Sequence, residues 1–347
     1  MQACSLLSLA TAVPPHDLDQ SLARKVAREA FARKDLFDRL SGVFANAAIE
    51  RRQLVAPPGW YQEARGWAER NALYLEAADQ LFVRAAAEAI EQAGLMPEDI
   101  DGIVGVSTTG IATPSLEARA ASRLGLRAGV RRVPLFGLGC AGGVSGLATA
   151  ARLALAEPGS NWLFVAVETC SISIRLDSDD PAAIVAAALF GDGCAAAVVR
   201  AGEGGIAKLG GSGEKLWPDT LGIMGWRVED PGLGVVFDRA IPPFVEAKLK
   251  AAVDEICEEI GVSPGDISRF CCHPGGVKVI EAIETALGLP AGKLDVEREV
   301  LRDHGNMSAP TVLFVLKRLI ERGLPERVMM TALGPGFTCS GLIVERA

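Results

Sequence analysis

One cysteine and two short motifs far from it in the sequence could together carry out nucleophilic chemistry. Cys140 lies in the run Gly-Leu-Gly-Cys-Ala-Gly-Gly, and the two motifs are Cys-His-Pro-Gly-Gly around His273 and His-Gly-Asn-Met-Ser around Asn306. A thiol is a good nucleophile only as the thiolate, and an imidazole or a helix N-terminus can lower its pKa toward neutrality. The chain therefore offers a nucleophile and two candidate partners.

The segments on either side of Cys140 predict how its thiol is presented. Residues 130–136 have an extended character, whereas residues 143–156 are rich in alanine and leucine and contain no proline, which predicts a helix. A strand, a tight turn and a helix in this order present a nucleophile at the helix N-terminus.

Each of these residues also has a purely structural interpretation. A single cysteine among glycines and alanines is commonly a small buried hydrophobe, and the glycines can serve close packing alone. His273 precedes a proline and fits a turn, and Asn306 could merely cap a helix over residues 309–322. The three residues in combination favour a catalytic site.

Composition indicates a large acidic enzyme. The 347 residues are 49% hydrophobic and 22% charged, which suggests a large core and two fused units, and the formal net charge is -8. An acidic chain argues against nucleic acid or a membrane surface as the main partner. The sequence has no Cys-x-x-Cys pair, signal segment or membrane-spanning run, and only three histidines. We expect a soluble cytoplasmic enzyme with reduced cysteines and no zinc site.

The sequence repeats itself at an offset of 167 residues. A Gly-x-x-Pro-x-Asp-Ile pattern at Gly94 recurs at Gly261, in each case between a long amphipathic helix and a short apolar strand. The same offset carries the turn of Cys140 onto that of Asn306, and a helix and a strand follow each turn. We interpret this as a duplicated β-α unit, with chance likeness of two common turns as the alternative. Cys140 then belongs to one half, His273 and Asn306 to the other, and the site lies between them.

Five motifs resemble, in order and spacing over nearly the whole chain, those of the type III polyketide synthases, the chalcone and stilbene synthase family. They are the run around Cys140, Leu-Phe-Gly-Asp-Gly-Cys-Ala-Ala from Leu189, His-Pro-Gly-Gly from His273, Gly-Asn-Met-Ser-Ala-Pro from Gly305 and Gly-Pro-Gly-Phe from Gly334. The resemblance implies an α/β thiolase fold of two duplicated, five-layered α-β-α-β-α halves, here residues 1–205 and 206–347. It also implies a homodimer that uses coenzyme A thioesters without an acyl carrier protein.

The same resemblance implies a role for each of the three residues. Cys140 would attack a starter acyl-CoA and hold the acyl group as a thioester, while His273, as imidazolium, would keep the thiolate ionised. Malonyl-CoA would lose carbon dioxide, and His273 Nε2 and the Asn306 amide would stabilise the enolate oxygen. Further rounds of extension and a ring closure would follow, with no metal or redox cofactor.

Other positions match the family's cavity, entrance and dimer interface. Phe190 resembles a gating phenylalanine, although it could be ordinary core, and Val235 stands where plant members have a second one. The remaining cavity positions are small or polar: Thr108, Thr109, Cys170, Ser173 and Gly225. Coenzyme A phosphates need a basic entrance, and the candidates for coenzyme A binding are Arg51, Arg52 and Lys278 with Gly275 and Gly276. Thr113 stands where the family reaches across the dimer interface.

The starter is predicted from the cavity positions. Small side chains there, and Val235 at the second gate, favour a fatty acyl starter and an alkylpyrone or alkylresorcinol product. A malonyl-primed product of the tetrahydroxynaphthalene or phloroglucinol type is the alternative. The segment Phe-Cys-Cys before His273 lacks the tryptophan of plant members and resembles bacterial ones.

Three other classes share part of the pattern. A β-ketoacyl synthase of the initiating type has a Cys-His-Asn set, but its histidine stands in a His-Gln-Ala-Asn context and it performs one condensation. A papain-like protease has a Cys-Gly-Ser-Cys-Trp motif, which is absent. A non-catalytic scaffold would have no need for an intact Cys140, His273 and Asn306.

Overall fold

A nine-stranded mixed sheet contains strands of both halves of the chain. The computed structural model describes residues 3–31, 33–176, 178 and 180–347. The strand order is β11-β12-β13-β8-β1-β7-β6-β4-β5, and the antiparallel pair β1 and β8 joins the two halves. The strands are β1 (Cys4–Ala12), β4 (Ile100–Val106), β5 (Arg131–Leu135), β6 (Asn161–Thr169), β7 (Asp192–Ala201), β8 (Ala207–Leu216), β11 (Arg269–Cys272), β12 (Arg327–Gly334) and β13 (Thr338–Arg346).

The order of elements shows the duplication that the sequence predicts. The one-turn 3₁₀ helices Pro97–Asp99 and Pro264–Asp266 are 167 residues apart. The first follows α4 (Trp67–Gln92) and leads into β4, and the second follows α8 (Ile241–Glu259) and leads into β11. The two halves therefore place equivalent strand ends on the same side of the sheet.

One helix from each half lies at the centre of the molecule. α6 (Gly142–Ala156) and α11 (Thr311–Glu321) share one buried cluster with strands of both halves. Strand β6 shows the alternation that this packing requires, because Phe164 belongs to the central cluster and Val165 to the cluster beneath α4.

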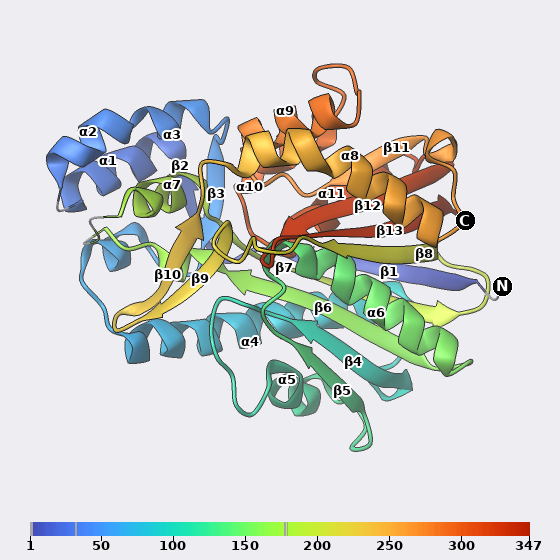
Figure 1. Ribbon diagram of the computed structural model, residues 1–347. Helices are drawn as coiled ribbons and strands as arrows, with labels where there is room; N and C mark the ends of the chain where they lie inside the picture. The colour runs from blue at the N-terminus through green and yellow to red at the C-terminus, as the bar shows by residue number, and fades with distance from the viewer. Residues whose placement is uncertain (1–2, 32, 177, 179) are drawn as a thin grey trace.

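Outer helices cover the two remaining faces of the strands. α4 and α5 (Leu116–Leu124) pack on strands of the first half, whereas α8, α9 (Val277–Ala286) and α10 (Asp295–His304) pack with the second half. Figure 1 shows these two groups of helices on opposite sides of the strands. The result is the predicted α/β thiolase fold, with the α-β-α-β-α layers counted across the two halves together.

Segments outside the duplicated units form a cap over one end of the sheet. α1 (Gln20–Ala30), α2 (Lys34–Leu40), α3 (Gly42–Asn46) and α7 (Pro181–Leu189) share a buried cluster with the 3₁₀ turn Pro58–Gln62. Two short antiparallel pairs complete it, namely β2 (His16–Asp19) with β3 (Arg51–Leu54), and β9 (Met224–Glu229) with β10 (Gly232–Phe237). The cap lies at the end of the sheet opposite to the two chain termini (Figure 1).

The glycines beside Cys140 allow the two halves to approach each other closely. A Cβ at Gly143 in α6 would lie 2.2 Å from the Ala309 carbonyl oxygen, and a Cβ at Gly334 would lie 2.6 Å from the Leu138 carbonyl oxygen. The packing interpretation of these glycines is therefore correct. The same close contacts press the turn of Cys140 against the segment that follows Asn306, so packing and the placement of the site have one cause.

Within the described residues, no helix combines the length and the apolar character needed to cross a membrane. All eight cysteines are buried and unpaired.

Candidate active site

Cys140 lies in the strand-turn-helix junction that the sequence predicts. It occupies the 3₁₀ turn Gly139–Ala141, between β5 and α6. Gly137 and Gly139 have φ values of 89° and 49°, which is why glycine stands at both positions. The Cys140 side chain is 8% exposed. Its place at the N-terminus of α6 favours negative charge on the sulfur.

His273 directly follows edge strand β11. Its backbone N–H donates to the Thr331 carbonyl at 2.9 Å, and its carbonyl accepts from the Gly275 N–H at 3.1 Å. The side chain is 5% exposed, and among the described residues neither Nδ1 nor Nε2 has a hydrogen-bond partner. Neither ring nitrogen is therefore committed to a protein partner among these residues.

Asn306 is held by hydrogen bonds on its backbone and its side chain. Its N–H donates to the Leu189 carbonyl at 2.8 Å, in the cap. Its Oδ1 accepts from the Ser308 N–H at 2.8 Å, and its Nδ2 donates to the Gly275 carbonyl at 3.1 Å. A carboxamide NH₂ has two donors, so the second N–H can point to a substrate. The contact with Gly275 ties Asn306 to the loop of His273.

The three residues line one cavity of about 380 Å³. Cys140 comes from the first half, and His273 and Asn306 come from the second, as the duplication predicts. Side chains of the cap and of α8 and α9 make most of the wall apolar. The charged side chains that line it are those of Asp238 and Lys278. The cavity is large enough for a small-molecule ligand, for which about 300–1,000 Å³ is usual.

A second, much smaller cavity of about 30 Å³ also reaches Cys140. The predicted pocket residues Phe190, Cys170, Gly225 and Val235 line it. Edge-to-face ring contacts narrow this side of the site: the Phe190 ring centroid lies 6.0 Å from that of Trp226 and 5.6 Å from that of Phe237.

Burial dominates the protonation of the nucleophile and its partner. Burial raises the pKa of the Cys140 thiol to about 12, against a lowering by the hydrogen bond with the Ser308 side chain. Burial lowers the pKa of the His273 imidazole to about 3. Burial thus favours the neutral thiol and the neutral imidazole, whereas the helix N-terminus favours the thiolate. The ion pair of Cys140 and His273 that the resemblance implies stays a prediction.

Three of the predicted pocket residues lie outside both cavities. The Thr108 N–H and the Thr109 hydroxyl donate to Oε2 of Glu168 at 2.9 and 2.8 Å, and Thr109 and Ser173 line a separate hollow of about 20 Å³. Burial raises the pKa of the Glu168 carboxyl to about 7. The sequence offered a signal for this residue, because Glu168 is the only charged side chain in strand β6.

The residues predicted for coenzyme A binding divide into two groups. Gly275, Gly276 and Lys278 line the larger cavity. The prediction for Arg52 is wrong, because its side chain is 1% exposed and its guanidinium donates to the carbonyls of Phe190 and Ala187. Arg52 instead fixes the segment that carries Phe190.

Arg51 and Thr113 are exposed and line none of the described cavities. Thr113 lies in the loop between β4 and α5, where the Thr113–Pro114 peptide bond is cis. The described residues contain no group of three or more His, Cys, Asp or Glu side chains placed to hold a metal ion.

Three residues of the β9–β10 hairpin belong to the site but were not among the predicted site residues. Met224 and Phe237 line both cavities, and Trp226 lines the smaller one. A signal was present for Phe237, since it follows Val235 by two positions on a strand and alternate residues share a face.

Comparisons with known proteins identify the family to which this fold belongs. The chalcone and stilbene synthase N-terminal domain matches residues 3–203, and the C-terminal domain of the same family matches residues 208–346. These matches leave the predicted boundary, between residues 205 and 206, in the interval between them. The chain therefore belongs to the chalcone and stilbene synthase family, the type III polyketide synthases, and it is an acyltransferase of the bacterial type.

Individual relatives match along nearly the whole chain. A 1,3,6,8-tetrahydroxynaphthalene synthase of Streptomyces peucetius subsp. caesius is 38% identical and covers 99% of this chain and 93% of its own length. A putative chalcone synthase of Bacillus subtilis (strain 168) is 36% identical over 97% of each chain. The crystal structure of the 1,3,6,8-tetrahydroxynaphthalene synthase of Streptomyces coelicolor A3(2) superposes with a TM-score of 0.92 at 28% identity over 99% of each chain.

Replacement of His273 by alanine tests its role as the acceptor of the thiol proton. His273→Ala should slow alkylation of Cys140 by iodoacetamide at pH 7 by about 10²-fold, a typical contribution of a general base. Because burial raises the pKa of the thiol to about 12, the rate in the variant should rise about tenfold for each pH unit up to that value. Peptide mass spectrometry at a series of pH values measures it.

His304→Ala is the matched control, because it removes a partly buried imidazole that lies outside the cavity. A His273→Ala variant that reacts at pH 7 as fast as the unchanged protein would show that another group takes the proton.

Proposed function

We propose that Cys140 is the nucleophile, and His273 and Asn306 its catalytic partners, in an iterative condensation of malonyl-CoA. The observation that carries this is the common cavity of the three side chains, which come from three separate elements of both halves. The unpartnered nitrogens of the buried His273 ring support it, since a buried polar group without a partner needs a functional reason.

Loading begins when Cys140 Sγ attacks the thioester carbonyl of an acyl-CoA. His273 accepts the thiol proton as the new carbon–sulfur bond forms, and it returns this proton to the coenzyme A sulfur as the old bond breaks. The acyl group is then a thioester on Cys140, and neither the sulfur nor the imidazole carries a charge. His273 is again neutral, which agrees with the lowering of its pKa by burial.

Decarboxylation of malonyl-CoA follows at the same place. Carbon dioxide leaves, and the electron pair of the broken bond forms an enolate whose oxygen accepts hydrogen bonds from His273 Nε2–H and Asn306 Nδ2–H. The enolate carbon attacks the Cys140 thioester, the carbon–carbon bond forms and the Cys140 sulfur departs as thiolate. Return of the extended chain to Cys140 permits another round.

The size of the smaller cavity supports a short starter, and we infer priming by malonyl-CoA itself. A volume of about 30 Å³ is an order of magnitude below the roughly 300 Å³ of a small drug-sized site. A long acyl chain could enter this smaller cavity only if Phe190, Trp226 or Phe237 moved. The relatives named 1,3,6,8-tetrahydroxynaphthalene synthase support the same class of product, an aromatic ring built from malonyl units.

A fatty acyl starter, with an alkylpyrone or alkylresorcinol product, is the second candidate. It is favoured by the small side chains of Cys170, Gly225 and Val235, and by open space at Gly225, where an added Cβ would meet nothing within 4 Å. On this alternative the rings of Trp226 and Phe237 beside Phe190 would move aside to admit the acyl chain.

Products formed from malonyl-CoA alone, and with acyl-CoAs of graded length, separate the two candidates. We expect an aromatic product from malonyl-CoA alone. Trp226→Ala should raise the rate of product formation from long acyl-CoAs about tenfold, because the smaller cavity is then large enough to admit the acyl chain. Trp217→Ala is the control, because Trp217 lines neither cavity, and it should leave this rate unchanged. Liquid chromatography with mass spectrometry measures both.

Products that need a long acyl-CoA in the unchanged protein would contradict malonyl priming and favour the second candidate. A single condensation would indicate a β-ketoacyl synthase, and no acylation of Cys140 by any thioester would contradict the proposed function.

For coenzyme A we propose an approach along the larger cavity, past Gly275 and Gly276, with Lys278 near its phosphates. The ammonium of Lys278 is a cationic group in a wall that is otherwise mostly apolar. The proposed condensation needs only coenzyme A thioesters. The absence of a metal or redox cofactor and the cytoplasmic location both stay predictions.

A homodimer through the edge of the sheet is our proposal for the assembly. β5 is an edge strand, and next to it Phe136 and Ile111 are 62% and 50% exposed. These side chains line a cavity of about 280 Å³, and Thr113 lies on the same loop as Ile111. An unpaired strand and exposed large apolar side chains favour association with a second copy.

Sedimentation velocity tests the dimer. The unchanged protein should sediment with twice the monomer mass, and Phe136→Asp should shift it to the monomer because a charge would be buried at the interface. A monomer at micromolar concentration would contradict the proposal.

A further inference from the structure

The orientation of the His273 ring depends on its backbone. Histidines in reactive sites commonly have one ring nitrogen bonded to a carboxylate or carbonyl group, which fixes the ring. Among the described residues no group does this for His273. The ring must therefore be placed by the peptide groups on either side of it and by packing.

A buried carboxylate accepts a hydrogen bond from the backbone N–H of the residue before His273. Glu297, in the first turn of α10, is 0% exposed, and its Oε1 accepts from the Cys272 N–H at 3.0 Å. Its Oε2 accepts from the Arg269 guanidinium at 2.8 Å. The Cys272 N–H belongs to the peptide group between Cys271 and Cys272, so this contact lies on the residue directly before His273.

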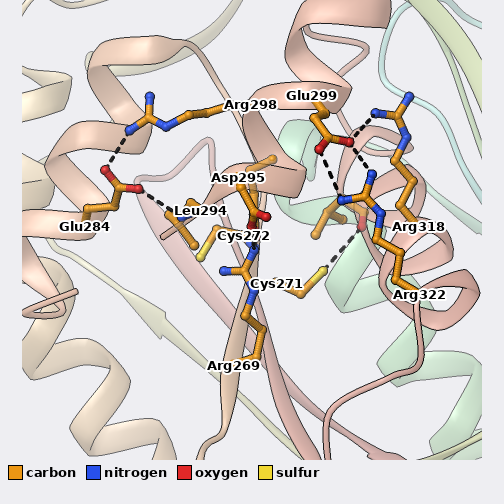
Figure 2. A network of polar contacts seen from close by, with 12 residues as sticks. Arg269, Cys271, Cys272, Glu284, Leu294, Asp295, Arg298, Glu299, Arg318 and Arg322 are labelled. Carbon is orange, nitrogen blue, oxygen red and sulfur yellow. Dashed lines mark hydrogen bonds and ion pairs between the residues drawn. The ribbon is translucent and has the colours of Figure 1, made fainter. Parts of the chain in front are cut away.

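Arg269 locks the carboxylate in place from the other end of the same strand. Its guanidinium also donates to Asp295 at 3.1 Å. Figure 2 shows Arg269 reaching toward Asp295, with Cys272 beside them. The charged groups around Glu297 are therefore Arg269 and Asp295, and the nearby titratable groups are the thiols of Cys271 and Cys272.

We propose that Glu297 is a positioning residue for His273. It fixes the end of edge strand β11, through Cys272, against α10, the helix that leads to Asn306. An edge strand has a partner strand on one side alone, and Glu297 supplies an acceptor where that partner is missing. The proposal rests on the catalytic role proposed for His273.

Glu284 provides a matched control in the same region. It is 4% exposed, its Oε1 accepts from the Leu294 N–H at 2.9 Å, and its Oε2 accepts from Arg298 at 2.6 Å. Figure 2 shows Glu284 bonded to Arg298 and to Leu294, away from Cys272. Both carboxylates thus hold one arginine and one backbone N–H, but only Glu297 holds the segment of His273.

The test compares Glu297→Ala with Glu284→Ala. Both should lower the midpoint of thermal unfolding, because each removes the acceptor of a backbone N–H and one acceptor of an arginine. Only Glu297→Ala should slow alkylation of Cys140 by iodoacetamide at pH 7, by about tenfold, which is the usual size of such an outer contact. Malonyl-CoA turnover should fall similarly in kcat, with KM within about twofold.

If Glu297→Ala does not fold, Glu297→Gln decides the matter against Glu284→Gln. The amide oxygen can serve only one of the two donors, and the charged guanidinium competes for it more strongly. The amide NH₂ then faces the Cys272 N–H, so alkylation should slow here as well.

Equal alkylation rates in the Glu297 and Glu284 variants would overturn the proposal and show that Glu297 is merely structural. If His273→Ala still slows alkylation, the function of His273 survives that result. If His273→Ala has no effect, it is the proposed function that fails.

Discussion

The site depends on the close contact of the two halves beside Cys140. α6 and α11 meet where Gly143 leaves no room for a side chain against the Ala309 carbonyl. Ala309 follows Asn306 by three residues, so the same contact brings Cys140 of one half to Asn306 of the other. Any side chain at Gly143 would push the helices apart and separate the reacting groups, because a packed core yields little to added volume.

Burial then decides how these groups react. A thiol and an imidazole taken out of water favour their neutral forms. In the mechanism that we propose, neutral His273 accepts a proton during loading and donates a hydrogen bond to the enolate during extension. The low dielectric of the apolar cavity strengthens that hydrogen bond. The same residue can serve both proposed steps, because its ring gains a proton only while the thioester forms and is neutral again before extension.

The sequence predicted elements whose signals are local. The turn of Cys140, the repeat at 167 residues and the placement of His273 and Asn306 in one half follow from glycine, proline and apolar periodicity. The prediction that Arg52 binds coenzyme A was wrong because its hydrogen-bond acceptors, the carbonyls of Phe190 and Ala187, are far from it in the sequence. Met224 was not predicted as a site residue for a similar reason. It lines both cavities only because the β9–β10 hairpin folds over the site, and local sequence does not show this.

The most direct measurement is release of carbon dioxide from malonyl-CoA by Cys140→Ala and by Asn306→Ala. We expect that Cys140→Ala still releases carbon dioxide but forms no covalent adduct, because the proposed oxyanion hole does not include the thiol. Asn306→Ala should lose about 10²-fold in release, yet still accept an acyl group on Cys140. If the rate of carbon dioxide release fell equally in both variants, the proposal that Asn306 stabilises the enolate while Cys140 only carries the acyl group would be contradicted.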